Sequence, residues 1–204
     1  MAFKKLNDTL KQALIEYSLQ SLTEFQSKVI TAIKGGRNTI VIAGEEKYKS
    51  TALAIGILQK VQVASEDDAP RAIIVVENKE KALEMEALLS KLAKRTDLRI
   101  VVLHEKGHKV YQRIDLYEGS DILIATQKRL FEMYLQNGVN FGQLKTLVID
   151  DAEVILRQDS KKEIERMTES ITKCQYVLLN NEMTARIEKS QDTFMTFPDI
   201  INFA

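Results

Sequence analysis

The 204-residue sequence has a single cysteine, only two prolines and no long apolar run. One cysteine, Cys174, excludes an internal disulfide and favours a reducing compartment, so we expect a cytoplasmic protein. No apolar run approaches the roughly 20 residues that span a membrane, and we expect no membrane partner. The N-terminal stretch "MAFKKLNDTLKQALIEY" is amphipathic and contains acidic residues, which is typical of a helix and not of a secretion signal.

Net charge is also lacking, because 29 basic residues balance 29 acidic ones. A nucleic-acid partner would therefore have to bind a local basic patch. The length suits one α/β domain with a sizeable core. The sequence contains no internal repeat and no evident linker, so we expect a single domain over residues 1–204, with residues 1–35 as a helical preface.

Short β-branched runs alternate with helical periods along most of the chain. The expected strands are 38–44, 71–77, 98–104, 121–126, 144–150 and 174–179. Helical periods cover 50–61, 79–94 and 127–138, the last of which closes at Gly138 as a helix stop. Several strands are apolar almost throughout, as expected for strands buried on both faces. This pattern predicts an α/β fold with a mostly parallel sheet, helices on both faces, and chemistry in the loops beyond the strand carboxyl ends.

Glycine is scarce in the loop after the first expected strand, "AGEEKYKS" at 43–50. Lys49 and Ser50 occupy the last two places of the phosphate-binding pattern G-x-x-x-x-G-K-[ST], in which the lysine binds phosphates and the hydroxyl binds Mg²⁺. The two glycine places hold Ala43 and Tyr48. Taken alone, the match is explained better by a solvated loop that leads into a helix.

Two carboxylates follow the fifth expected strand, in "LVIDDAEVIL". Asp150 stands where a second carboxylate that holds Mg²⁺ belongs, and Asp151 is a candidate for polarising an attacking water. Aspartate also caps helix N-termini well, so a structural role explains the same residues.

Residues 104–108 spell H-E-x-x-H, the signature of zinc proteases. That chemistry needs His104 and His108 one helical turn apart and a third ligand downstream. The segment instead follows a strand directly and contains Gly107, which disfavours a helix by about 1 kcal/mol. We expect surface histidines in a loop and no zinc.

Taken in order, these segments resemble the first RecA-like domain of the DEAD-box RNA helicases, a fold of the P-loop NTPase type, over nearly the whole chain. The resembling segments are Leu22–Gln26 with Phe3 upstream, 43–50, 76–82, His104–Lys106, Thr126–Leu130, Asp150–Glu153 and Asn180–Glu182. The resemblance implies ATP and Mg²⁺ as ligands, with Gln26 in the place that reads adenine and Phe3 in the upstream aromatic place. It also implies that Lys49 and Ser50 bind the nucleotide.

The resemblance further implies contacts to RNA phosphates from two loops. Asn78 and Lys79 stand for the Thr and Arg of V-P-T-R-E-L-A, and Thr126 and Arg129 match T-P-G-R-L, with Lys128 as an added cation. Backbone contacts of this kind imply affinity without sequence preference. An ordinary solvated helix N-terminus with basic residues is the alternative.

Several departures from the family pattern affect catalysis. Glu46 and Tyr48 replace glycines, which predicts backbone strain or a blocked phosphate cradle, and Glu45 adds another negative charge. Asp151 is one methylene shorter than the family's catalytic Glu, and Asn180–Glu182 replaces S-A-T. The second RecA-like domain, with its arginine finger, is not part of these 204 residues.

We therefore expect a stand-alone domain with degenerate motifs that acts as a pseudoenzyme. It would bind RNA phosphates or a protein partner, with weak or lost ATP binding and no helicase activity of its own. One alternative is the ATP-binding half of an RNA helicase, completed in trans by a second RecA-like domain. Another is a scaffold that has kept only the fold.

Overall fold

The protein is described by a computed structural model that covers residues 6–204, apart from the side chains of Gln158 and Asp159. Seven parallel strands form one sheet in the order β3-β4-β2-β5-β6-β1-β7. Their bounds are β1 Thr39–Ile42, β2 Ala72–Val76, β3 Ile100–Leu103, β4 Ile122–Thr126, β5 Thr146–Asp150, β6 Gln175–Asn180 and β7 Asp199–Asn202. The predicted α/β fold with a parallel sheet is confirmed.

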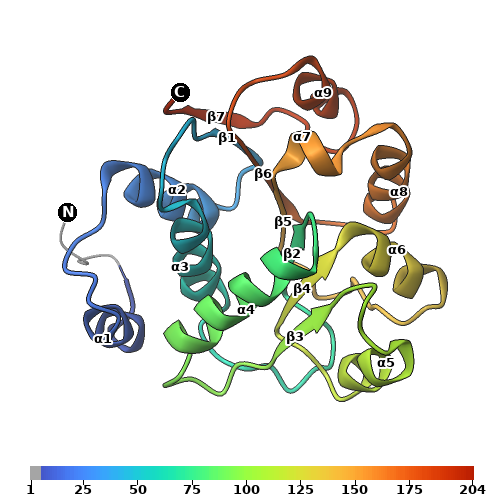
Figure 1. The fold of residues 1–204 in the computed structure, drawn as a ribbon, viewed down its shortest axis with the longest axis horizontal. Coiled ribbons are helices and arrows are strands. Elements are labelled where there is room, and N and C mark those ends of the chain that lie inside the picture. Colours follow the sequence, from blue (N-terminus) through green and yellow to red (C-terminus); the bar gives the residue numbers. More distant parts are fainter. Residues whose placement is uncertain (1–5) are drawn as a thin grey trace.

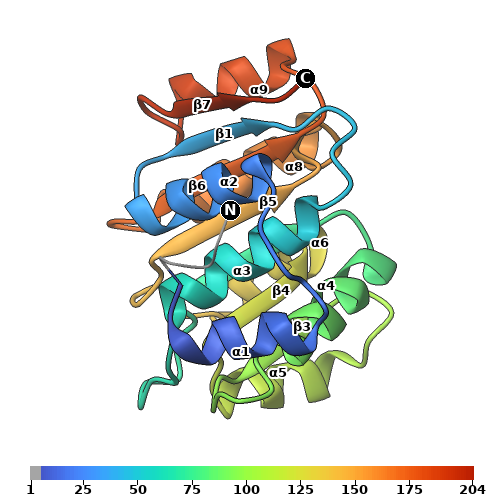
Figure 2. The ribbon, with the colours of Figure 1, turned by 90° about the vertical axis from the view of Figure 1, so that its left-hand side faces the viewer.

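Helices cover both faces of the sheet (Figure 1). One layer consists of α1 Asp8–Glu16, α2 Glu24–Gly35, α3 Lys49–Val61 and α4 Lys79–Leu92. The other consists of α5 Lys109–Tyr117, α6 Gln127–Leu135, α7 Ala152–Ile155, α8 Gln158–Thr168 and α9 Ala185–Glu188, with a 3₁₀ turn at Lys189–Asp192. Figure 2 shows the first layer from outside, with α1 lying across α3 and α4. Between residues 6 and 204, no helix is long and apolar enough to cross a membrane.

Alternation along the strands divides the core into two clusters. In β1, Val41 packs with the first helical layer, whereas Ile40 and Ile42 pack with the second. Both faces of the central strands are buried, which explains why their sequences are almost continuously apolar. Gly56 lets α2 and α3 approach closely, because a Cβ there would come within 2.6 Å of Cδ1 of Ile33.

All six expected strands are present, and β7 is the one that the sequence did not reveal. It is four residues long, pairs only with β1 and has half-buried and exposed positions, so it lacks the apolar run of a buried strand. The stop after α6 also differs slightly from expectation. Asn137, and not Gly138, adopts the left-handed conformation, with φ of 52°.

A buried ion-pair network closes the amino end of the sheet. The fully buried carboxylate of Asp121 accepts hydrogen bonds from Arg71 Nη2 at 2.7 Å, from Arg99 Nε at 3.1 Å and from the backbone N–H of Ser65 at 2.8 Å. Burial alone would raise the pKa of Asp121, but these hydrogen bonds outweigh burial and hold the pKa below its usual range. The network anchors β2, β3 and β4 to one another.

Candidate functional site

The loop between β1 and α3 turns at Gly44, whose φ is 50°. A Cβ on Gly44 would lie 3.2 Å from both the carbonyl oxygen of Phe203 and the Cα of Ala204. The N–H of Glu46 donates to the carbonyl of Ala43 at 3.0 Å. A phosphate cradle would need this amide N–H, but the turn directs it toward the protein itself.

The left-handed strain expected at Glu46 and Tyr48 is absent, and that expectation is corrected here. Tyr48 has a φ of −111°, and Glu46 is not among the residues of positive φ. The chain avoids the strain because it makes its left-handed turn at Gly44, two residues before Glu46. The consequence is a loop of a different shape, and not a strained copy of a phosphate loop.

Lys49 begins α3 and folds back over this loop. Its Nζ donates to the carbonyl of Gly44 at 2.9 Å and contacts Oδ1 of Asn181, which follows β6. Ser50 is the second residue of α3 and is exposed, and together with Lys49 it lines a cleft at the carboxyl edge of the sheet. Partners in the loops that follow two neighbouring strands, β1 and β6, therefore hold the ammonium of Lys49.

Asp150 and Asp151 lie at the end of β5, which is separated from β1 by β6. Burial raises the pKa of Asp150, while the positive charges of Lys81 and Lys49 act in the opposite direction. Asp151 has φ of 55° and stands at the N-cap position of α7, yet its side chain makes no capping bond. Its carboxylate instead contacts the ammonium of Lys81, which reaches across from α4.

The loops after β5 and β6 are also joined. Oδ1 of Asn180 accepts from the N–H of Glu153 at 3.1 Å, and its Nδ2 donates to the carbonyl of Glu182 at 2.8 Å. Glu153 in turn contacts Thr184 and Arg186. A physical connection between these two loops is thus present, although the residues differ from the family pattern.

Gln26 is fully buried in the first turn of α2. Its Oε1 accepts from the N–H of Thr23 at 3.0 Å in a capping box, and its Nε2 has no hydrogen-bond partner among the described residues. An unused buried donor is what a residue that reads a ligand would retain. Phe3, the other residue proposed to contact adenine, lies outside the described residues.

These elements line a cleft of about 490 Å³ along the carboxyl edge of the sheet. Its lining comes from the end of α1, the β1–α3 loop, the start of α3, α4 and the end of β5. The lining residues are Tyr17, Glu46, Lys47, Lys49, Ser50, Lys81, Glu84, Met85, Leu88, Asp150 and Asp151. Three lysines and four carboxylates therefore face one hollow, and they largely neutralise one another.

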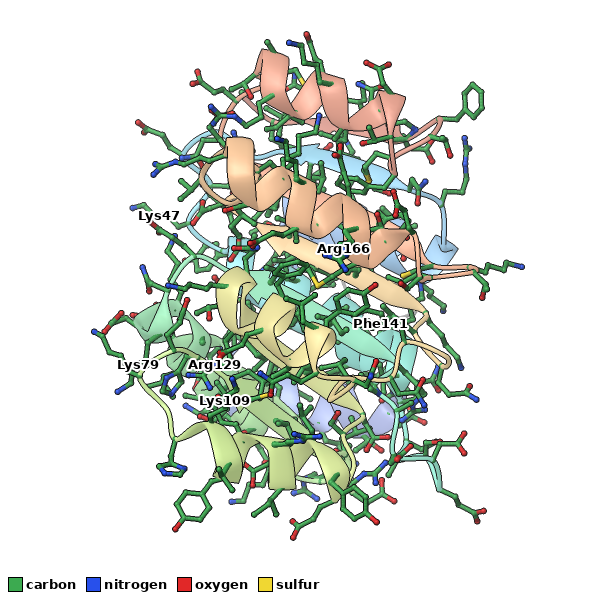
Figure 3. All side chains as sticks on the ribbon, turned by 90° about the vertical axis from the view of Figure 1, so that its right-hand side faces the viewer. Lys47, Lys79, Lys109, Arg129, Phe141 and Arg166 are labelled. Carbon is green, nitrogen blue, oxygen red and sulfur yellow. The ribbon has the colours of Figure 1, made fainter. Side chains whose placement is uncertain are left out.

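The proposed RNA residues occupy the same edge of the sheet, farther along. β2 and β4 pair directly, in the register Val76↔Thr126, so the helices that follow them begin side by side. Lys79 is the first residue of α4, and Lys128 is the second residue of α6 and is exposed. Figure 3 shows Lys79, Arg129 and Lys47 on one side of the molecule, and the charges of Lys79 and Arg129 both act on His104.

Three of the five proposed RNA residues already have partners within the protein, and two of these, Thr126 and Arg129, are buried. Thr126 is buried and donates to Oε2 of Glu105 at 2.8 Å. Arg129 is 6% exposed, donates to the carbonyl of Glu105 at 2.9 Å and pairs with Glu132 at 3.2 Å. Its buried Nη1 has no hydrogen-bond partner in the described part of the chain. These two side chains hold the β3–α5 loop against α6.

The Asn78 side chain also has a structural task. Its Oδ1 caps α4 by accepting from the N–H of Lys81 at 3.0 Å. Lys79 and Lys128, by contrast, have no ion-pair partner among the described residues. Both lysines therefore remain available for an external anion at the starts of α4 and α6.

His104 and His108 lie in the loop between β3 and α5, so they are not one helical turn apart. Burial lowers the pKa of His104, and the nearby positive charges of Lys79 and Arg129 lower it further. Among the side chains that the structure describes, no three of His, Cys, Asp or Glu are grouped so that they would hold a metal ion.

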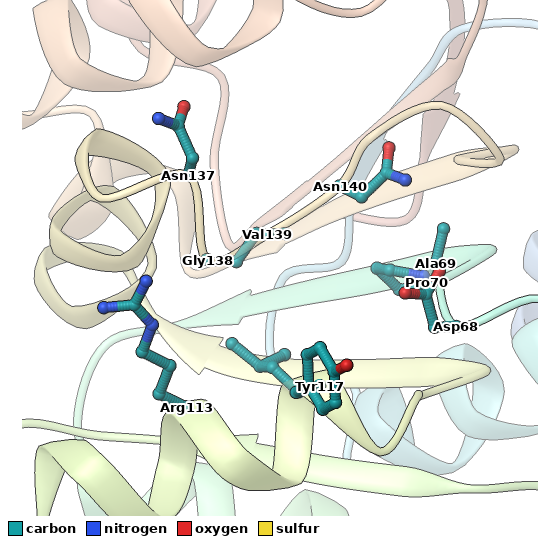
Figure 4. A pocket seen from close by; sticks show the side chains of 10 residues that line it. Asp68, Ala69, Pro70, Arg113, Tyr117, Asn137, Gly138, Val139 and Asn140 are labelled. Atoms are coloured by element: carbon teal, nitrogen blue, oxygen red, sulfur yellow. The ribbon is translucent and has the colours of Figure 1, made fainter.

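Another hollow, of about 170 Å³, lies at the opposite end of the sheet (Figure 4). It is formed where β2, β4 and β5 begin, and Arg113 and Tyr117 of α5 face Asn137 and Asn140 across it. None of the motif residues above lines it. The residues that the sequence singles out therefore lie away from this hollow.

Comparison with known proteins agrees with this geometry. The family model described as DEAD/DEAH box helicase matches residues 23–189. Among curated relatives, "ATP-dependent RNA helicase dbp3" of Neosartorya fischeri is 26% identical over 201 residues, which span 96% of this chain and 39% of that protein. "ATP-dependent RNA helicase dbp9" of Aspergillus niger is 26% identical over 203 residues, spanning 96% of this chain and 33% of that protein.

A solved structure titled as a DEAD box protein from the hyperthermophile Methanococcus jannaschii superposes with a TM-score of 0.88, at 20% identity. The match covers 99% of this chain and 56% of that one, and it supports the RecA-like fold. The chain thus spans 33–39% of the length of these two curated relatives. With the family model matched over most of its length, the chain belongs to the DEAD/DEAH box helicase family.

Proposed function

We propose that this domain binds single-stranded RNA by its phosphates, without base preference, and uses ATP and Mg²⁺ weakly or not at all. The observation that carries the proposal is the pair of free cations, Lys79 and Lys128, at the adjacent starts of α4 and α6. A strand that crosses both helix starts would meet two ammonium groups and the positive ends of two helix dipoles.

The magnitude of this binding follows from the number of free cations. Each phosphate contact on a single strand contributes about −0.7 to the slope of log affinity against log salt, so two contacts predict about −1.4. A rise in salt from about 50 to about 200 mM should then weaken binding about sevenfold. Homopolymers should bind alike, because phosphates carry no sequence information.

Weak use of ATP is supported by the β1–α3 loop. The N–H of Glu46 is bonded to Ala43, and the carboxylates of Glu45 and Glu46 would repel a triphosphate. Asp151 is both shorter than the family's catalytic Glu and engaged with Lys81. Calorimetry with ATP and Mg²⁺ tests this part, and a micromolar dissociation constant would contradict it.

Fluorescence anisotropy on a short labelled oligonucleotide tests the RNA part. Lys79→Ala and Lys128→Ala should each flatten the salt slope by about 0.7, and the double variant should remove most binding at low salt. Lys34→Ala is the matched control, because it removes the same charge from the end of α2, away from this edge. Equal binding by the wild type and the double variant would refute the proposal.

A second candidate function is the ATP-binding half of a helicase that a second RecA-like domain completes in trans. It is favoured by the cleft of about 490 Å³, in which the positive charge of Lys49 still acts on Asp150. RNA-stimulated phosphate release on addition of such a domain would support it.

A further inference from the structure

The cleft carries a cation that sequence comparison does not assign, the ammonium of Lys81. Lys81 is the third residue of α4, and its Nζ contacts Oδ2 of Asp151 and lies 3.3 Å from Oε2 of Glu77. The side chains of Lys81 and Asp151 are 37% and 28% exposed, so the pair is partly shielded from solvent. The ammonium therefore has two carboxylate partners from two different loops.

The fold places this ammonium beside the carboxylates by topology. β2 and β5 are neighbours in the register Val75↔Ile149, so α4 begins next to the end of β5. Asn78 caps α4 at the N–H of Lys81, which fixes where the helix starts and which residue faces the cleft. Changing either β2 pairing or this cap would move the lysine away from Asp151.

A second ammonium, that of Lys49, approaches from the other side of the same carboxylates. The charges of Lys81 and Lys49 both act on Asp150. Three carboxylates, those of Asp150, Asp151 and Glu77, thus share two ammonium groups, which compensate most of their negative charge. Divalent cations need several oxygen ligands that carry an uncompensated negative charge. The residues present do not fit the Mg²⁺ ion that the family implies.

We propose that the Lys81 ammonium is the resident cation of the Asp150–Asp151 pair, in the place of a divalent ion, so that this cleft does not bind Mg²⁺. The inference concerns the same cleft as the proposed weak use of ATP but is independent of RNA binding. It predicts that the carboxylates accept a divalent ion once the ammonium is removed.

Mn²⁺ titration followed by electron paramagnetic resonance, which reports free Mn²⁺ directly, tests this without nucleotide or RNA. We expect no site tighter than a few millimolar in the wild type, and a gain of at least tenfold in Lys81→Met, which removes the charge but keeps most of the side-chain length. The gained site should be lost in Lys81→Met combined with Asp151→Asn. Lys47→Met is the matched control, since Lys47 lines the same cleft, and it should bind no more Mn²⁺ than the wild type.

Two results would overturn the inference: Mn²⁺ binding by the wild type as tight as by Lys81→Met, or no gain in a folded Lys81→Met protein. If Lys81→Met does not fold, the single variant Asp151→Asn decides. Asp151→Asn should bind no more Mn²⁺ than the wild type, which we expect to bind none. A Mn²⁺ site that is present in the wild type and is lost in Asp151→Asn would refute the proposal. RNA binding measured in the same buffers separates failure here from failure of the proposed function.

Discussion

Arg129 offers the sharpest contrast between a family resemblance and this structure. The resemblance makes it an RNA contact, whereas the structure buries it against Glu105 and Glu132. Arg129→Met removes the charge and keeps most of the packed stem. The lost bond to the Glu105 carbonyl, at 2.9 Å, is a charged hydrogen bond worth about 1.5–3 kcal/mol. The pair with the half-exposed Glu132, at 3.2 Å, adds less than about 1 kcal/mol.

The free energy of unfolding should therefore fall by about 2–4 kcal/mol, which lowers Tm by roughly 5–15 °C in a chain of this size. Urea unfolding followed by circular dichroism measures this, with Lys128→Met as a control on the exposed face of the same helix, expected within about 0.5 kcal/mol of wild type. The salt slope of RNA binding should be unchanged in Arg129→Met. A loss below about 1 kcal/mol, or a slope flattened by about 0.7, would refute the reasoning.

Three further predictions concern other residues. Glu105→Gln keeps an acceptor for Thr126 but removes a negative charge beside the proposed strand path, so RNA anisotropy should show affinity raised about fivefold at low salt; unchanged affinity would place the strand elsewhere. Asp151→Ala should be less stable than Asp151→Gly by about 1–2 kcal/mol in urea, because φ is 55° there; equal stabilities would contradict that backbone. Asp121→Asn should cost about 3–5 kcal/mol. Because the folded pKa of Asp121 is depressed, its contribution to the free energy of unfolding is present above its unfolded pKa, near 4, and is lost as pH falls below that value. The wild type should therefore lose more stability in acid than Asp121→Asn does, and an equal or smaller loss would count against the prediction.

Much of the fold was predictable from the sequence because it rests on local patterns. Strands buried on both faces give apolar runs, and the helices between them show the 3.6 period, so six of the strands and the α/β class followed. β7 was not predictable in this way, because an edge strand of four residues with exposed positions has no such run. The shape of the β1–α3 loop was also missed, since it depends on Gly44 lying under Phe203, far along the chain.

The candidate site was predictable in position but not in its contacts. The loops after β1, β2, β4 and β5 do meet at one edge, as parallel strands require. Lys81 was not identified, because its role depends on β2 lying beside β5, which the order of the chain does not reveal. Glu105 was missed as well: only the packing of the β3–α5 loop brings it onto Thr126 and Arg129. The one signal in the sequence is that Lys81 lies in the first turn of a helix that begins at the same edge of the sheet as the predicted carboxylate pair.

The most direct test of the central claim is a single RNA titration performed in two buffers, one with ATP and Mg²⁺ and one with EDTA and no nucleotide. If this domain holds RNA phosphates through Lys79 and Lys128, and its nucleotide cleft is weak and neutralised by its own lysines, the two anisotropy curves should coincide at equal ionic strength. An RNA affinity that rises severalfold with ATP and Mg²⁺ would contradict the account, because it would require a working nucleotide site coupled to the RNA surface.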